Sequence, residues 1–248
     1  MKLNSVIRVC PVMACGVFLL VMASCGGGRV SDAQQTTQPP ANIQPLVKQV
    51  DDGQEKRRAV EAQYKAMQIP DLIRNLEADS TKDVEPYNSL AYREIITRGA
   101  GVGRELAAAI QNPNRQSFLT LIALRSVNKE AYETVDSKTR VAVLVDALRT
   151  SKYFNTWGLP HAYWEDSAKA IIEQGRAASE PLKSLLADKR PAPVWGSEEV
   201  AEYQKYKYRV CDYAWALLAA IDGNKLQIPS DPAQRDQLIS AIDSQSPK

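Results

Sequence analysis

Histidine is the residue type best suited to acid–base chemistry near neutral pH, and this chain has a single one, His161. Glu165 and Asp166 follow shortly after it, and a histidine close to a carboxylate could act as a general base. A catalytic pair of this kind also needs a nucleophile on a sharp turn, and the sequence contains no Gly-x-Ser-x-Gly segment. The sequence therefore favours an ordinary loop histidine and no catalysis, with an enzyme centred on His161 and Glu165 as a minor alternative.

Cysteine is also uncommon in this chain. The four cysteines are Cys10, Cys15, Cys25 and Cys211. A zinc site needs about four ligands at close spacing, and these cysteines and one histidine do not supply them. Cys211 lies on an apolar helical stripe, where a cysteine usually behaves as a small buried hydrophobic residue. We expect no metal site, no cofactor and no internal disulfide framework.

Cys25 differs from the other cysteines in the sequence that precedes it. Residues 1–8 carry Lys2 and Arg8, and the mostly apolar stretch 9–22 is shorter than the roughly 20 residues that span a bilayer. Met22-Ala23-Ser24-Cys25 follows and resembles a bacterial lipobox, with an apolar residue, two small residues and a cysteine. The resemblance implies that residues 1–24 are a signal peptide and that the Cys25 thiol receives a diacylglyceryl group. An ordinary cleaved signal peptide and an uncleaved anchor helix are the alternatives.

A lipoprotein of this kind would be anchored to a membrane of the cell envelope, because several acyl chains hold far more firmly than one. The anchor would lie in the outer membrane of a bacterium with two membranes, facing the periplasm, or on the cell surface of a bacterium with one. Residues 25–52 are rich in Gly, Gln, Thr and Pro and are predicted to form a disordered tether.

The charge balance argues against nucleic acid as a partner. Lys plus Arg total 31 and Asp plus Glu total 29, and two of the cations, Lys2 and Arg8, belong to the signal peptide. The mature chain is therefore close to neutral, whereas phosphate backbones are bound by clustered excess positive charge.

Beyond the tether, apolar residues recur at helical spacing and no long alternating pattern occurs, which predicts an all-α body. Val141, Leu144, Val145 and Leu148 occupy one helical face. A longer apolar stripe runs through 200–221 and predicts one long helix that ends at Asp222-Gly223, and Tyr203 and Tyr206 are expected to pack inward on it.

One stretch of this body occurs twice. Residues 91–112 align with residues 167–188 without a gap, and Gly99 aligns with Gly175. The flanking helical patterns also correspond, which predicts two duplicated units at about 69–128 and 139–223. Because a helical hairpin cannot bury its apolar face alone, such units are expected to stack.

The order of leucine-rich helix, turn, second helix and glycine resembles that of HEAT repeats. The resemblance implies a short α-solenoid of about four helical hairpins, at 69–99, 101–128, 139–175 and 177–223. The whole domain would cover 53–245. Segments 55–67 and 231–243 would cap its two ends.

Aromatic residues concentrate in two inserts, 152–165 and 190–200, of the second unit. Inserts in repeat proteins often form a binding face, and aromatic side chains are common anchors of interfaces. Trp157, His161, Trp164 and Trp195 are therefore the candidate binding surface. The alternative is that these rings pack as a local core.

These expectations together favour a non-catalytic binding or scaffolding module, whose partner is another envelope protein. The alternative is a small-molecule or glycan receptor, with Trp157, Trp164 and Trp195 as a stacking site.

Overall fold

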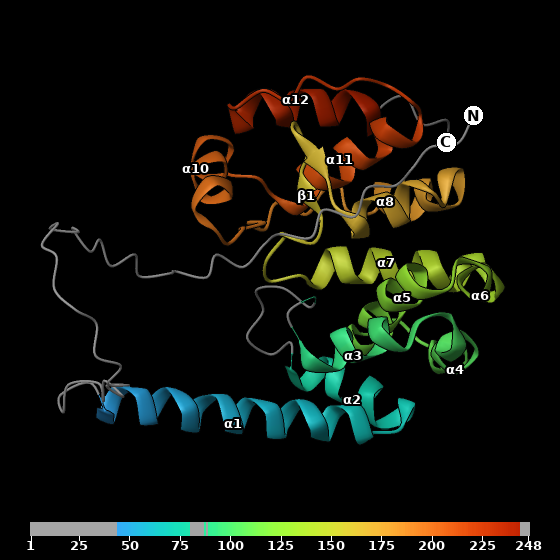
Figure 1. Ribbon diagram of the computed structural model, residues 1–248. Helices are drawn as coiled ribbons and strands as arrows, with labels where there is room; N and C mark the ends of the chain where they lie inside the picture. The colour runs from blue at the N-terminus through green and yellow to red at the C-terminus, as the bar shows by residue number, and fades with distance from the viewer. Residues whose placement is uncertain (1–43, 80–86, 88, 244–248) are drawn as a thin grey trace, which may run out of the picture. The chain divides into compact units, whose positions relative to one another are not determined.

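The computed structural model describes residues 44–79, 87 and 89–243 of the chain (Figure 1). The chain separates into two units, Met1–Lys48 and Gln49–Lys248, and the described residues of the first unit are those at the start of the first helix. The predicted signal peptide, Cys25 and residues 26–43 of the predicted tether lie outside the described residues. They stay predictions.

The described residues are mostly helical, which confirms the all-α class. The longer helices are α1 (Gln44–Ala66), α2 (Ile69–Asp79), α3 (Leu90–Arg98), α5 (Arg115–Val127), α7 (Ser137–Thr150), α10 (Ser197–Tyr206), α11 (Val210–Ile221) and α12 (Pro232–Asp243). The shorter helical segments are η3 (Gly99–Val102), α4 (Gly103–Ala109), α6 (Lys129–Thr134), α8 (Asp166–Ile172), η4 (Gly175–Ala178) and α9 (Ser179–Lys183). The sheet of this part of the chain is one antiparallel pair, β1 (Gly158–Leu159) and β2 (Tyr163–Trp164).

Helix α1 corrects one boundary of the sequence analysis. Residues 44–52 were assigned to the tether, but the helix begins at Gln44 and continues through them to Ala66. This stretch is rich in Gln, Lys, Glu and Ala, which have high helix propensity, and its poorest helix formers are Pro45 in the first turn and Gly53 in the interior. Composition that is polar enough for a tether is therefore also suitable for a solvated helix.

Four helices of the body begin at a side-chain cap. Ser89, Asn114, Asn128 and Asp136 each accept a hydrogen bond from the backbone N–H three residues later, at the starts of α3, α5, α6 and α7. Each cap satisfies one of the N–H groups that a helix leaves without an internal partner. These short polar residues therefore fix where the hairpins turn.

The two aligned stretches adopt the same order of elements. α3, η3 and α4 follow one another in the first, and α8, η4 and α9 follow one another in the second. Gly99 and Gly175 stand at the same junction, with φ of +66° and +57°. A residue with a side chain rarely has a positive φ, so the two glycines allow a sharp turn after the first helix of each aligned stretch.

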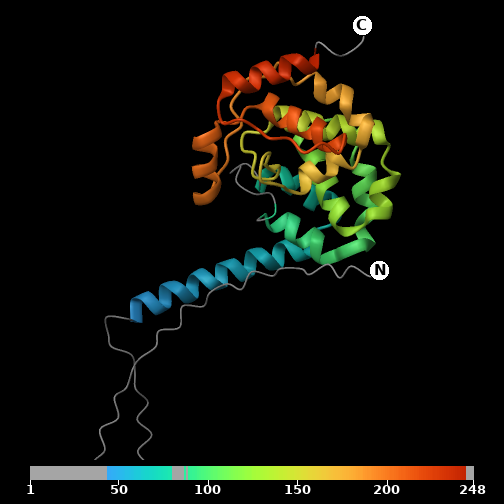
Figure 2. The ribbon, with the colours of Figure 1, turned by 90° about the horizontal axis from the view of Figure 1, so that it is seen from above.

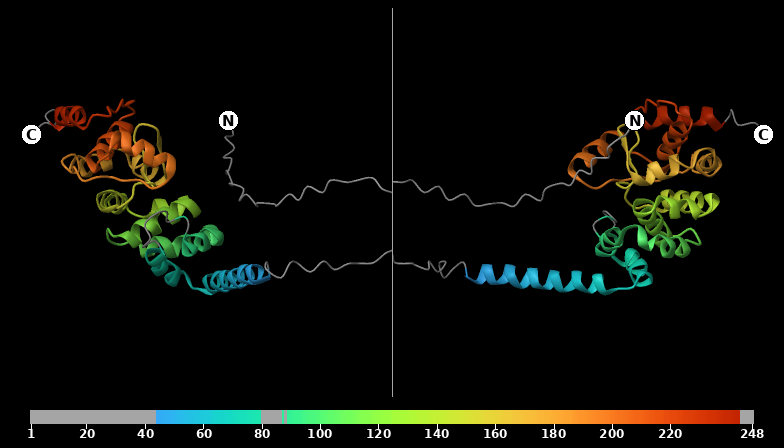
Figure 3. Two further views of the ribbon diagram at one scale, coloured as in Figure 1. Left: turned by 90° about the vertical axis from the view of Figure 1, so that its left-hand side faces the viewer. Right: turned by 45° about the vertical axis from the view of Figure 1, so that its right-hand side comes forward.

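Consecutive helices lie side by side along the body. Helix α5 contacts α2, α3 and α4, and it also contacts α7 and α8 of the following unit. Helix α11 contacts α8 and α9. In Figures 1 and 3 the colours run in chain order from α2 to α12, so segments that are neighbours in sequence are also neighbours in space.

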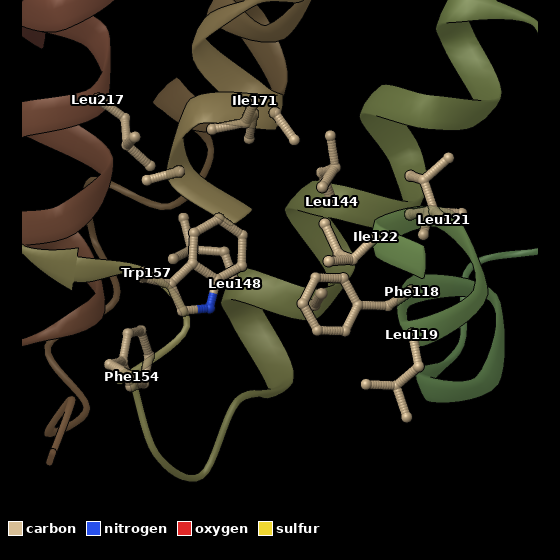
Figure 4. Close-up of a cluster of buried hydrophobic side chains, with 14 of the residues drawn as sticks. Phe118, Leu119, Leu121, Ile122, Leu144, Leu148, Phe154, Trp157, Ile171 and Leu217 are labelled. Carbon is tan, nitrogen blue, oxygen red and sulfur yellow. The ribbon is translucent and has the colours of Figure 1, made fainter. Parts of the chain in front are cut away.

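The core between α5, α7, α8 and α11 is continuous (Figure 4). Leu144 and Leu148 of α7 lie between Phe118 of α5 and Ile171 of α8, and all four are almost fully buried. Apolar burial of this kind stabilises a fold by about 25 cal/mol per Å². This shared core holds α5 against α7 and α8.

Helices α10 and α11 correct a second expectation. The stripe through 200–221 predicted one helix, but the chain leaves the helix after Tyr206 and resumes it at Val210. Lys207 has φ of +49°, and the backbone there is left-handed. Figures 1 and 2 show α10 at the edge of the body, away from the stacked helices. The turn allows apolar residues of both helices to pack against the same core, although the two helices point in different directions.

The last helix, α12, is fixed by a buried ion pair. Arg235 of α12 and Asp212 of α11 have no exposed side-chain surface, and Arg235 Nε lies 3.0 Å from Asp212 Oδ1. Arg235 also donates to the carbonyl oxygens of Pro229, Ser230 and Tyr206. Because removing one partner of such a pair leaves a buried charge, this contact makes the position of α12 specific.

Candidate binding surface at the two inserts

The first insert is shaped by the hairpin β1–β2. Gly158 pairs with Trp164 and has φ of +82°. A Cβ at this position would lie 2.4 Å from the carbonyl oxygen of Tyr163, so only glycine fits. The hairpin therefore presents His161 in its loop and leaves Tyr163 41 % exposed.

His161 is held by α10 and the segment that follows it. Its Nε2 lies 3.0 Å from Glu202 Oε1, and its Nδ1 lies 2.6 Å from the hydroxyl of Tyr208. The ring also stacks on Tyr206, with centroids 4.5 Å apart. The carboxylate that the structure places against His161 is thus Glu202, whereas the sequence analysis had named Glu165. The imidazole therefore touches Glu202, Tyr206 and Tyr208, and through these contacts His161 fastens the hairpin to α10 and the segment after it.

Trp157 is not part of a surface, and its inclusion in the predicted binding face is wrong. The side chain is fully buried, stacks on Phe118 with centroids 6.1 Å apart, and donates from Nε1 to Ser151 Oγ at 3.1 Å (Figure 4). Burying a ring of this size contributes more to stability than any surface contact it could make. The predicted stacking site of three tryptophans is wrong for the same reason.

Trp164 and Trp195 differ from Trp157 and from each other. Trp164 is half-buried against the core, and Trp195 is 57 % exposed. The backbone of Trp195 is fixed on both sides by Asn155, whose side chain accepts from its N–H at 2.8 Å and donates to its carbonyl oxygen. The ring of Tyr153 packs edge-on against the indole, with centroids 6.2 Å apart. An exposed indole on a fixed backbone is pre-organised for contact with a partner.

Three residues that the sequence analysis did not select complete this surface. Tyr163 stands beside Glu199, whose carboxylate also folds over Gly196, next to Trp195. Partial burial, and then the Glu199 carboxylate, raise the pKa of the Tyr163 hydroxyl above its usual value. Glu198 adds a third polar group at the start of α10. The one sequence signal for these residues was their place within or beside the inserts.

An apolar groove elsewhere on the body involves different residues. It has a volume of about 840 Å³, and its apolar lining residues are Pro113, Val141, Ala142, Val145, Ala177 and Pro181, with Ser137, Lys138, Asp146 and Arg149 beside them. None of the tryptophans lines it. This groove and the insert surface are separate features, and the aromatic side chains belong to the latter.

The described residues contain no group of three or more His, Cys, Asp and Glu side chains arranged to hold a metal ion. Cys211 is fully buried, and its burial raises the pKa of the thiol to about 12. A thiol in this state is not a nucleophile at neutral pH. Across residues 44–79 and 89–243, none of the helices combines the length and apolar character of a membrane span.

Comparison with known proteins finds no matching family model, no similar curated protein and no similar solved structure.

Proposed function

We propose that this chain is a lipid-anchored protein of the bacterial cell envelope whose helical body is a non-catalytic protein-binding module. The anchor is Cys25, at the end of the lipobox-like segment, and the tether after it holds the body at the membrane. The partner is another envelope protein. The proposal for the anchor rests on the sequence alone.

The body is, in this proposal, a short HEAT-like α-solenoid. Its hairpins are α2 with α3, α4 with α5, α7 with α8, and α9 with α11, which correspond to the four expected repeats. The equal order of elements in the two aligned stretches and the contacts between consecutive helices support this arrangement. Solenoids offer broad surfaces to partners, and their inserts often form the binding face.

The observation that carries the binding role is the presentation of Trp195. Large aromatic side chains are the costliest to leave exposed and the most effective interface anchors. Two hydrogen bonds from the Asn155 side chain fix the backbone of Trp195, although this residue remains 57 % exposed. A ring needed only for packing would be buried, as Trp157 is.

Two measurements on the full chain in cells test the two parts of the proposal. For the anchor, Cys25→Ser is expected to abolish incorporation of labelled palmitate and to move the protein from the membrane to the soluble fraction. A variant that is still labelled and still sediments with membranes would contradict the anchor.

For the binding role, a photoreactive benzoylphenylalanine replaces Tyr163, which is exposed and lies beside Glu199. Illumination is expected to produce a defined adduct with one envelope protein, and Trp195→Ala is expected to reduce that adduct strongly. The same photoreactive residue at Ile96, which is 38 % exposed on α3, is the matched control. An adduct insensitive to Trp195→Ala, or no protein adduct, would refute the assignment of the surface.

A further inference from the structure

Three aromatic side chains of the inserts, the exposed Tyr163 and Trp195 and the half-buried Tyr153, lie near the acidic end of α10. We define the insert patch as Tyr153, Tyr163, Trp195, Glu198 and Glu199. Tyr153 contacts Trp195, Glu199 lies beside both Tyr163 and Gly196, and Glu198 precedes Glu199 in the first turn of the helix. Aromatic faces and carboxylates are therefore combined on one small surface.

The charge of this patch is negative. The largest charge effects on the Tyr163 hydroxyl come from three carboxylates, Glu199, Glu165 and Glu198. The cations of α10 and its C-cap, Lys205 and Lys207, lie at the opposite end of the helix. A helix N-terminus carries about half a positive charge, which offsets only part of the two charges of Glu198 and Glu199.

The two carboxylates differ in their surroundings. Glu198 is exposed, whereas Glu199 is half-buried and its carboxylate accepts a hydrogen bond from the Tyr163 hydroxyl. Among the residues that the structure describes, no salt-bridge partner is found for either of them. The patch therefore combines negative charge with aromatic rings, and both features attract cationic groups. Cationic side chains bind over aromatic rings within about 6 Å and pair with carboxylates.

We infer that the insert patch binds a lysine- or arginine-bearing segment of the partner protein, with cationic side chains seated between the ring of Trp195 and the carboxylates of Glu198 and Glu199. This inference rests on the proposed function, since it assigns the chemistry of the partner at the same surface. A neutral glycan would use the rings but would have no need of the two carboxylates.

The test uses the full acylated chain purified in a neutral detergent. The probe is a dye-labelled peptide of alternating Lys and Ser, and the reference peptide has Glu in place of Lys. Fluorescence anisotropy gives the dissociation constants. We expect the Lys peptide alone to bind, and its affinity to fall severalfold when the salt concentration rises from about 0.05 M to about 0.5 M.

Two variants locate the binding. Glu198→Gln with Glu199→Gln, and separately Trp195→Ala, are each expected to weaken binding of the Lys peptide by about tenfold. The matched controls are Glu130→Gln with Glu133→Gln on α6, which are also exposed, and Ile96→Ala. They are expected to leave the affinity unchanged, and circular dichroism checks that every variant is folded.

Equal binding of the two peptides, or affinities unchanged by the patch variants, would overturn the inference. The photo-crosslinked adduct at position 163 then separates it from the proposed function. An adduct that persists with Glu198→Gln and Glu199→Gln would leave the binding role standing and remove only its charge requirement.

Discussion

At the scale of single residues, the tryptophans show that one residue type has opposite roles in neighbouring segments. Trp157 is fully buried and hydrogen-bonded to Ser151, whereas Trp195 is 57 % exposed. Trp157→Ala removes a core ring and leaves a cavity, so we expect a loss of about 3–5 kcal/mol in the free energy of unfolding. Trp195→Ala is expected to change it by less than about 0.5 kcal/mol. Urea denaturation followed by circular dichroism measures both values.

A similar destabilisation by the two substitutions would mean that Trp195 is structural too. The exposure of Trp195 would then no longer support a binding role for the insert patch, because the contribution of the indole to stability would explain its position.

At the scale of elements, an ion pair joins α5 to the residue that follows the last turn of α8. Arg125 donates to both carboxylate oxygens of Glu173, at 2.7 and 3.1 Å. The hydrogen-bonded guanidinium lowers the pKa of Glu173 below its ordinary value, although partial desolvation acts in the opposite direction. A carboxyl group with a lowered folded pKa stabilises the fold above its unfolded pKa, and this contribution disappears as the pH falls through the folded pKa.

Glu173→Gln should therefore be less stable than the wild type at neutral pH, by at most about 1 kcal/mol because the pair is partly exposed. The difference is expected to shrink as the pH falls from about 5 to about 3, where the wild-type carboxyl group becomes protonated. Urea midpoints at several pH values give this difference, with Glu130→Gln as the control. A difference that stays constant over the whole pH range would show that the ion pair contributes nothing.

At the scale of the whole molecule, the aligned stretches offer a test of stacking. Leu106 and Leu182 occupy matched positions, and both are fully buried. Leu106→Ala and Leu182→Ala should each cost about 2–5 kcal/mol. Because α5 contacts helices of both units, we expect one cooperative transition in each variant.

Circular dichroism reports on all helices, and tryptophan fluorescence reports only on the second unit, which contains all four tryptophans. Coincident transitions by the two probes are the expected result. If Leu106→Ala separates the two curves, the units unfold independently and do not form a single stack.

The sequence by itself determined the features that depend on local pattern. Period-3.6 apolar spacing indicated the helices, and the internal alignment placed the same elements at 91–112 and 167–188, including the turns at Gly99 and Gly175. The export signal that we propose before Cys25 is also a local pattern, and it lies outside the residues that the structure describes.

The tertiary structure alone decided which aromatic side chains are buried and which carboxylate meets His161. Burial of Trp157 depends on Phe118, which lies far away in the sequence, and the exposure of Trp195 depends on Asn155 across the two inserts. The break at Lys207 also escaped the sequence analysis, because an apolar stripe continues unchanged across a turn when both helices face the same core. Composition shows that rings are present, but the packing of distant segments decides what they face.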